Sequence, residues 1–92
     1  MESIYLNDKI KFSVEPKGKN IRLIASEADV ELACRKESLK RINNFLSIEN
    51  EHLFKGRLQL IKHKNQIDVK IKGLIVGSME VQQFKEALNK SK

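Results

Sequence analysis

Basic side chains are the residues of this chain whose number and spacing most clearly suggest a chemistry, the binding of anions. Residues 55–72 hold six of them against one carboxylate, that of Asp68, which gives a net charge of +5 out of +6 for the whole chain. Residues 1–54 hold nine basic and nine acidic side chains. Concentrated positive charge attracts nucleic-acid phosphates, acidic protein surfaces or anionic lipid. The six basic residues are Lys55, Arg57, Lys62, Lys64, Lys70 and Lys72.

Residues that could perform catalysis or hold a metal ion are few and scattered. His52 and His63 have no second histidine or cysteine at the spacing of a metal site. Cys34 would act as a nucleophile only beside a histidine or lysine in space, and a cysteine on the apolar face of a strand is more often buried. Residues 73–78 lack the lysine and the glycine spacing of a phosphate-binding loop. We therefore expect a binding protein that is not an enzyme and needs no metal or cofactor.

The sequence pattern of residues 55–73 predicts a β-hairpin, and this hairpin holds the basic side chains. Aliphatic and polar residues alternate in both arms, which indicates half-buried antiparallel strands. With residues 64–65 as a two-residue turn, Leu60 faces Val69. This register collects every aliphatic side chain except Ile61 on one face, and a slip of one residue would scatter them.

The opposite face of this hairpin would place Arg57 directly across from Lys72. Like charges in that position are mildly destabilising, by up to about 1 kcal/mol. A surface that meets an anion would show such tolerated repulsion. A solvated strand whose lysines prevent aggregation would show the same pattern.

Residues 9–26 predict a second hairpin. Apolar residues alternate on both sides of residues 16–19, whose proline and glycine are typical of a turn. A four-residue loop there would pair Val14 with Ile21. Residues 1–8 could add a short edge strand, because their apolar residues also alternate.

Residues 27–35 fit either a strand or a helix. In a strand, Val30, Leu32 and Cys34 share one face. In a helix, Ser26 or Asp29 could cap the N-terminus. We prefer the strand, because charged residues interrupt the apolar face of the helix.

Two amphipathic helices are predicted, over residues 37–47 and 79–89, from apolar residues at the spacing of one helix face. Residues 48–52 are expected to be a connection. Residues 74–76 are expected to continue the second strand of the basic hairpin, with Gly73 as a bulge.

These elements predict an α+β fold, in which an antiparallel sheet of about five strands carries two helices on one face. The other face would be an open basic platform. Residues 9–47 and 53–90 could form a weak internal repeat of sheet-then-helix units, although any two strand-to-helix junctions look alike at this level. The secondary candidates on the open face are Lys9, Lys11, Arg22, Ile24, Ile61 and His63.

Length and composition indicate one domain, residues 1–92. The N-terminus lacks the pattern of a signal peptide, and no apolar run is long enough to span a bilayer. One cysteine excludes an intrachain disulfide. We therefore expect a cytoplasmic protein that does not engage a membrane.

Two functions fit these features. The first is a small protein that contacts nucleic-acid phosphates, of DNA or RNA, through the basic hairpin. The second is an inhibitor or adaptor, of the immunity or phage-encoded type, that docks its basic sheet face on an acidic protein. A homodimer through an edge strand or the open sheet face is a further possibility.

Overall fold

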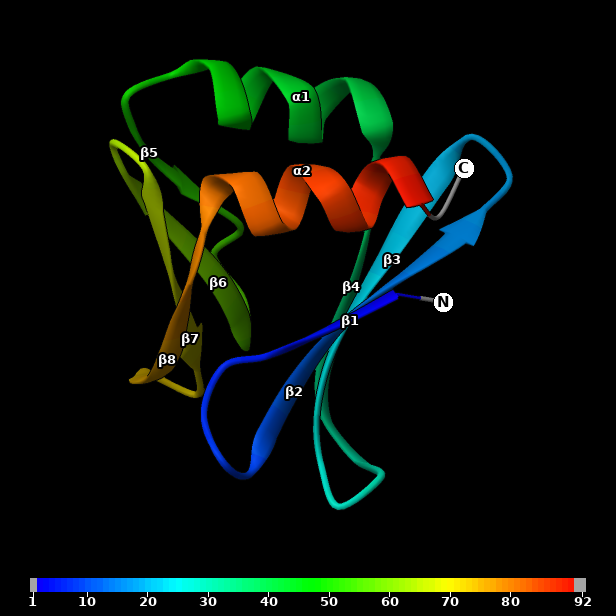
Figure 1. Cartoon of the computed structure of the whole chain (residues 1–92), viewed down its shortest axis with the longest axis vertical. Helices are drawn as coiled ribbons and strands as arrows, with labels where there is room; N and C mark the ends of the chain where they lie inside the picture. Colours follow the sequence, from blue (N-terminus) through cyan, green and yellow to red (C-terminus); the bar gives the residue numbers. More distant parts are fainter. Residues whose placement is uncertain (1, 91–92) are drawn as a thin grey trace.

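The computed structural model describes residues 2–90, which fold into two four-stranded antiparallel sheets and two helices (Figure 1). The first half consists of β1 (Glu2–Tyr5), β2 (Ile10–Lys17), β3 (Asn20–Glu27), β4 (Val30–Ser38) and α1 (Leu39–Ser47). The second half consists of β5 (Asn50–Leu53), β6 (Leu58–His63), β7 (Gln66–Ile71), β8 (Leu74–Glu80) and α2 (Val81–Lys90). In each sheet the strands lie in chain order.

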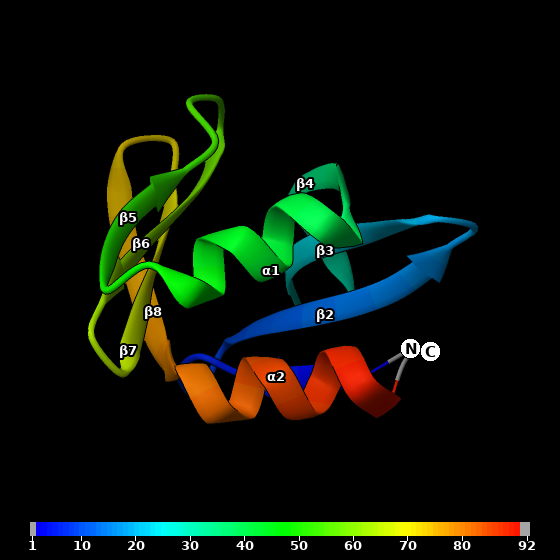
Figure 2. The same cartoon turned by 90° about the horizontal axis from the view of Figure 1, so that it is seen from above.

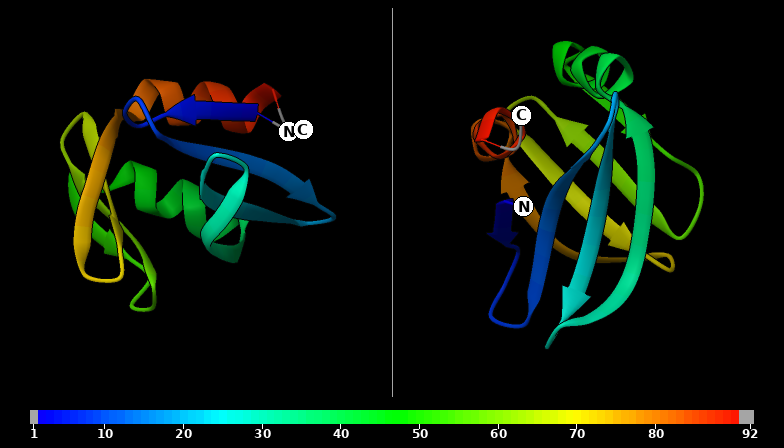
Figure 3. Two further views of the ribbon diagram at one scale, coloured as in Figure 1. Left: turned by 90° about the horizontal axis from the view of Figure 1, so that it is seen from below. Right: turned by 90° about the vertical axis from the view of Figure 1, so that its right-hand side faces the viewer.

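The prediction of an α+β fold with antiparallel strands and two helices is confirmed, but the prediction of one five-stranded sheet is wrong. The first sheet (β1–β4) and the second sheet (β5–β8) lie on opposite sides of one core, with α1 and α2 packed between and beside them (Figures 2 and 3). Because both sheets turn their apolar faces to this core, their outer faces point away from each other. The expected continuous basic platform therefore does not form.

One apolar cluster holds the two sheets and both helices together. Phe12 of β2 and Phe84 of α2 are fully buried, and their rings meet edge to face with centroids 5.8 Å apart. Such a contact contributes about 1 kcal/mol beyond the area that it buries. Ile42 and Phe45 bring α1 to the same cluster. The two sheets are thus parts of one folded unit.

The register predicted for the basic hairpin is confirmed. Leu60 of β6 pairs with Val69 of β7, and residues 64–65 form the turn, in which Lys64 takes a positive φ of 54°. The hairpin is not a free ribbon, however. It lies at the centre of the second sheet, between β5 and β8.

The hairpin of β2 and β3 exists, but its predicted register is wrong by two residues. Val14 pairs with Leu23 rather than Ile21, because the turn contains only Gly18 and Lys19. Gly18 has a φ of 65°, a value that glycine adopts without strain. A shift of two residues leaves the same side chains on the apolar face, so the sequence pattern cannot distinguish the two registers.

The prediction of a strand in residues 27–35 is confirmed by β4, but Cys34 is exposed and not buried. Ala28 and Asp29 form the turn between β3 and β4, and both have positive φ angles. Farther along, a bulge at Leu32 shifts the register, so that Cys34 pairs with Ile24 on the outer face of the first sheet. One extra residue thus reverses the side of the sheet to which each following side chain points.

Residues 48–52 and 74–76 also differ from expectation. Asn50 begins β5, which is an additional edge strand. Lys72 and Gly73, with φ angles of 52° and 86°, form a reversing turn instead of a bulge. The chain therefore turns back into β8, which continues through Ser78 to Glu80.

Both helices form with the predicted apolar faces inward. Ser38 caps α1, since its hydroxyl accepts a hydrogen bond of 3.2 Å from the backbone N–H of Arg41. In residues 2–90 no helix is long and apolar enough to cross a bilayer. The two halves share the order of four strands and one helix. A repeat of residues 9–47 in 53–90 nevertheless stays a prediction, because a shared order of elements does not establish a repeated sequence.

Gly77 of β8 lies against the loop that joins β1 to β2. A Cβ atom at this position would lie 2.7 Å from the Cβ and 2.9 Å from the carbonyl oxygen of Leu6. We expect Gly77→Ala to lower the free energy of unfolding by about 1–3 kcal/mol, because backbone must move to accommodate the methyl group. Chemical denaturation would measure this loss.

Gly56→Ala is the matched control. A Cβ atom on Gly56 would meet its nearest neighbour, Arg35 Nη1, at the ordinary distance of 3.5 Å. Equal losses of stability in the two variants would contradict the close packing of Gly77 against Leu6.

Candidate functional site

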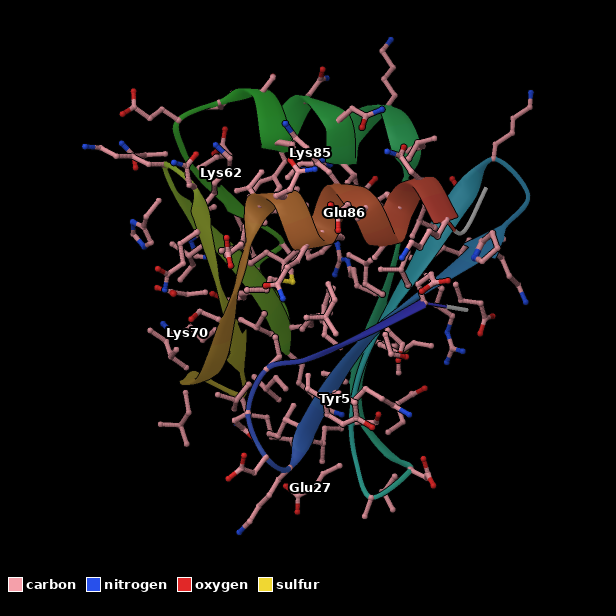
Figure 4. The ribbon with its side chains drawn as sticks, viewed as in Figure 1. Tyr5, Glu27, Lys62, Lys70, Lys85 and Glu86 are labelled. Carbon is pink, nitrogen blue, oxygen red and sulfur yellow. The ribbon has the colours of Figure 1, made fainter. Side chains whose placement is uncertain are left out.

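The end of the second sheet that contains the turn at residues 72–73 gathers cationic side chains on its outer face. Arg57 lies across from Lys72, whose backbone N–H donates a hydrogen bond of 2.9 Å to the Arg57 carbonyl. Lys70 lies on β7 with its side chain on the outer face, opposite to those of Val69 and Ile71, and Lys72 lies in the turn that follows β7. Figure 4 shows Lys70 on the outer side of the second sheet. The backbones of Arg57 and Lys72 are therefore adjacent, as the predicted register requires, whereas the apposition of their side chains stays a prediction.

The loop before β6 brings a further cation from the first sheet. Phe54 is buried, and the guanidinium carbon of Arg35 lies 4.9 Å from the centre of its ring. Arg35 Nη1 is also a near neighbour of Gly56. This stacking holds Arg35 of β4 against the loop that contains Lys55. We refer to Arg35, Lys55, Arg57, Lys70 and Lys72 together as the cationic cluster.

The cationic cluster is not neutralised by carboxylates. None of its members forms an ion pair with another residue of 2–90. The nearest acidic residue on the outer face, Asp68, is held by other partners: His63 Nε2 lies 3.5 Å away and Gln66 Nε2 donates to it over 3.4 Å. Uncompensated charges of one sign on one surface repel one another, and an anion would relieve that repulsion.

Two of the six predicted basic residues lie elsewhere. Lys62 is only 5% exposed, and its Nζ donates a hydrogen bond of 2.6 Å to the carbonyl of Ile48, the C-cap of α1. Lys64 is exposed but lies at the opposite end of β6. Six residues of strand separate it from Arg57, a distance of about 20 Å. Lys62 is therefore not available to a ligand, and Lys64 is remote from the cluster.

The secondary candidates of the first sheet are mostly engaged with acidic neighbours. Arg22 Nη2 lies 2.7 Å from Glu31 Oε1, and Lys11 Nζ lies 3.7 Å from Asp29. A hydrogen bond to the Cys34 sulfur, together with Glu31, raises the pKa of Arg22 above its ordinary value. Lys9 is exposed in the loop before β2. Of these candidates, Lys11 and Arg22 are thus paired with carboxylates.

The remaining predictions about exposed groups have mixed outcomes. Ile24 is nearly buried on the outer face of the first sheet, and Ile61 is partly buried on the outer face of the second. His63 is exposed and faces Asp68. Of the aromatic side chains near the sheet ends, Tyr5 is exposed and Phe54 is buried. Figure 4 shows that Tyr5 lies away from Lys70, so within residues 2–90 no exposed aromatic ring accompanies the cluster.

Arg35, Leu74 and Ile75 belong to this end of the molecule but were not singled out from the sequence. Arg35 joins the cluster only because β4 contacts the second sheet, and no local pattern indicates that contact. Leu74 and Ile75 are 71% and 59% exposed. A run of aliphatic residues predicts burial, so their exposure could have been inferred only from the turn at Gly73.

Other chemistry is not apparent in residues 2–90. These residues contain no group of three or more side chains arranged to hold a metal ion. A hollow of about 460 Å³ beside Tyr5 mixes the cations Lys9 and Lys11 with the carboxylates of Asp8 and Asp29, so it has no consistent charge. The cationic cluster is therefore the most distinctive candidate site.

Comparison of the chain with models of known protein families, with curated proteins and with solved structures finds no match. The function must therefore be argued from the residues of the chain itself.

We expect Lys62→Met to lower the free energy of unfolding by about 1–3 kcal/mol, because the carbonyl of Ile48 would lose a charged donor within the protein. Urea denaturation would measure this change. Lys64→Met, which removes the same charge from an exposed turn, should change stability by less than about 0.5 kcal/mol. Comparable effects of the two substitutions would contradict a structural role for Lys62.

Proposed function

We propose that the protein binds nucleic acid by contacting phosphates with the cationic cluster. The observation that carries this proposal is that five cations, from β4, the 54–57 loop, β7 and the turn after β7, form no ion pair with a carboxylate of residues 2–90. Phosphate contacts supply most of the affinity of non-specific nucleic-acid binding.

The surroundings of the cluster favour a duplex over a single strand. Proteins that bind single strands usually stack bases on exposed aromatic rings. Here the nearby ring, Phe54, is buried and its face is covered by Arg35. Exposed lysine and arginine side chains without a stacking platform suit the regular phosphate rows of a double helix.

The β6–β7 hairpin cannot insert into a groove as an isolated ribbon. It is flanked by β5 and β8, and four strands span about 14 Å between the outer two, whereas the major groove is about 12 Å wide. The sheet would therefore lie on the phosphate rows. Its outer face would contact them through Arg57, Lys70 and Lys72.

An inhibitor or adaptor that docks on an acidic protein is the second candidate. The exposure of Leu74 and Ile75 beside the cations favours it, because protein interfaces combine apolar anchors with a charged rim. A homodimer and a cytoplasmic location stay predictions.

Fluorescence anisotropy of a labelled 20-base-pair duplex tests the proposal. Five phosphate contacts predict a slope of about −4.5 for the logarithm of affinity against that of salt concentration, a loss of several hundred-fold between roughly 50 and 200 mM salt. Lys70→Glu/Lys72→Glu should weaken binding at least tenfold and reduce the magnitude of the slope by about 2.

Lys17→Glu/Lys19→Glu is the matched control, because it changes the net charge equally at exposed positions of the β2–β3 hairpin. It should leave the slope unchanged. Absence of binding at 50 mM salt would contradict the proposal and favour the second candidate function, docking on an acidic protein. An equal loss of affinity in both double variants would show that the net charge of the protein, and not the cationic cluster, determines binding.

A further inference from the structure

Hydrogen-bonding side chains lie beside Lys70 on the outer face of the second sheet. Gln59 of β6 pairs directly with Lys70 of β7, so the two side chains share this face. His52 of β5 pairs with Ile61, which follows Gln59 by two residues and therefore points to the same side. His52 is exposed and Gln59 is partly exposed. The cationic cluster thus borders groups that can donate and accept hydrogen bonds.

His52 and Gln59 are held in place by two consecutive hydrogen bonds. Gln59 Nε2 donates over 3.1 Å to the carbonyl oxygen of Gly56, which can only accept. Gln59 Oε1 therefore faces His52 Nε2 at 2.8 Å, and this ring nitrogen carries the proton of the bond. Within residues 2–90, His52 Nδ1 and the second N–H of the Gln59 amide have no partner. One acceptor and one donor are thus preorganised to bind a ligand.

The one carboxylate of the β6–β7 hairpin, that of Asp68, is held toward the other end of the sheet. His63 Nε2 lies 3.5 Å from it, and Gln66 Nε2 donates to it over 3.4 Å. His63 and Gln66 flank the turn at residues 64–65, the end of the hairpin that is remote from the cationic cluster. A polyanion would therefore be drawn to the end of the face that holds Lys70.

The chemistry of the duplex surface identifies the ligand. A sheet that lies on a duplex without entering a groove contacts only the groups displayed at the surface. B-form DNA displays phosphates there and keeps its base edges inside the grooves. A-form RNA has a wide, shallow minor groove that displays 2′-hydroxyls, each of which can donate and accept a hydrogen bond. Cations beside a preorganised donor and acceptor therefore match RNA better than DNA.

We propose that the ligand is double-stranded RNA in the A form, and that His52 and Gln59 form hydrogen bonds to its 2′-hydroxyls while the cationic cluster contacts its phosphates. This inference rests on the proposed function, in which the outer face of the second sheet lies on the phosphate rows. It adds a preference for RNA over DNA.

The test compares three labelled duplexes of one sequence and length: RNA, RNA with fluorine in place of every 2′-hydroxyl, and DNA. The fluorinated duplex keeps the A form and the same phosphates, but fluorine cannot donate a hydrogen bond and accepts one only weakly. By anisotropy at pH 8, the wild-type protein should bind RNA about tenfold more tightly than either of the other duplexes, the gain expected from two hydrogen bonds. The dependence on salt should be the same for RNA and the fluorinated duplex.

His52→Ala/Gln59→Ala should bind RNA and the fluorinated duplex with equal affinity, and its salt dependence should stay that of the wild type because no phosphate contact is removed. His63→Ala/Gln66→Ala is the matched control. It removes the same two residue types from a directly paired, exposed position at the other end of the same face. This variant should keep the wild-type ratio of affinities. Circular dichroism would establish that each variant is folded.

The outcomes separate this inference from the proposed function. No binding to any duplex at low salt would overturn both. Salt-dependent binding with equal affinity for RNA and the fluorinated duplex would overturn the contacts to 2′-hydroxyls and leave phosphate binding intact. The same would follow if DNA bound as tightly as RNA, or if His52→Ala/Gln59→Ala kept the wild-type ratio. Loss of the ratio in the control variant would overturn the assignment to His52 and Gln59.

Discussion

The sharing of one apolar core by two sheets is the constraint on which the rest of the structure depends. Phe12 of the first sheet, Phe84 of α2 and Phe45 of α1 meet in a single cluster with the inner face of the second sheet. Each sheet therefore has one inner and one outer face. The cations of the second sheet become a separate surface, because those of the first sheet face the other side of the molecule.

Local patterning was sufficient to predict one hairpin register and both helix faces, but not the register of the β2–β3 hairpin. The pairing of Leu60 with Val69 and the apolar faces of both helices follow from alternation and helical spacing, and all were correct. The number of strands was not predictable in this way. The turn at Lys72 and Gly73 reverses the chain within a run of β-forming residues, and the division into two sheets depends on contacts between distant segments.

The candidate site was predicted only in part, because some of its residues are brought together by contacts between distant segments of the chain. Strand parity places Lys70 on the outer face, and the hairpin register brings the backbone of Arg57 next to that of Lys72; this much could be read from the sequence. The alternation of side chains along β6 also places Lys62 on the apolar face. Only the fold shows that the end of α1 provides the acceptor of its hydrogen bond. Arg35 could not be assigned to the site from sequence, because it reaches the cluster through Phe54, a residue of the other half of the chain.

The central claim is that the end of the second sheet and its junction with β4 form the ligand-binding surface. Titration of the isotopically labelled protein with a short RNA duplex, followed by backbone amide NMR spectra, tests it most directly. We expect the amide signals of residues 35, 54–57 and 70–75 to shift progressively, while those of the β2–β3 hairpin stay in place. Shifts centred on the outer face of the first sheet, around Lys11 and Arg22, would contradict the account, as would unchanged spectra at low salt.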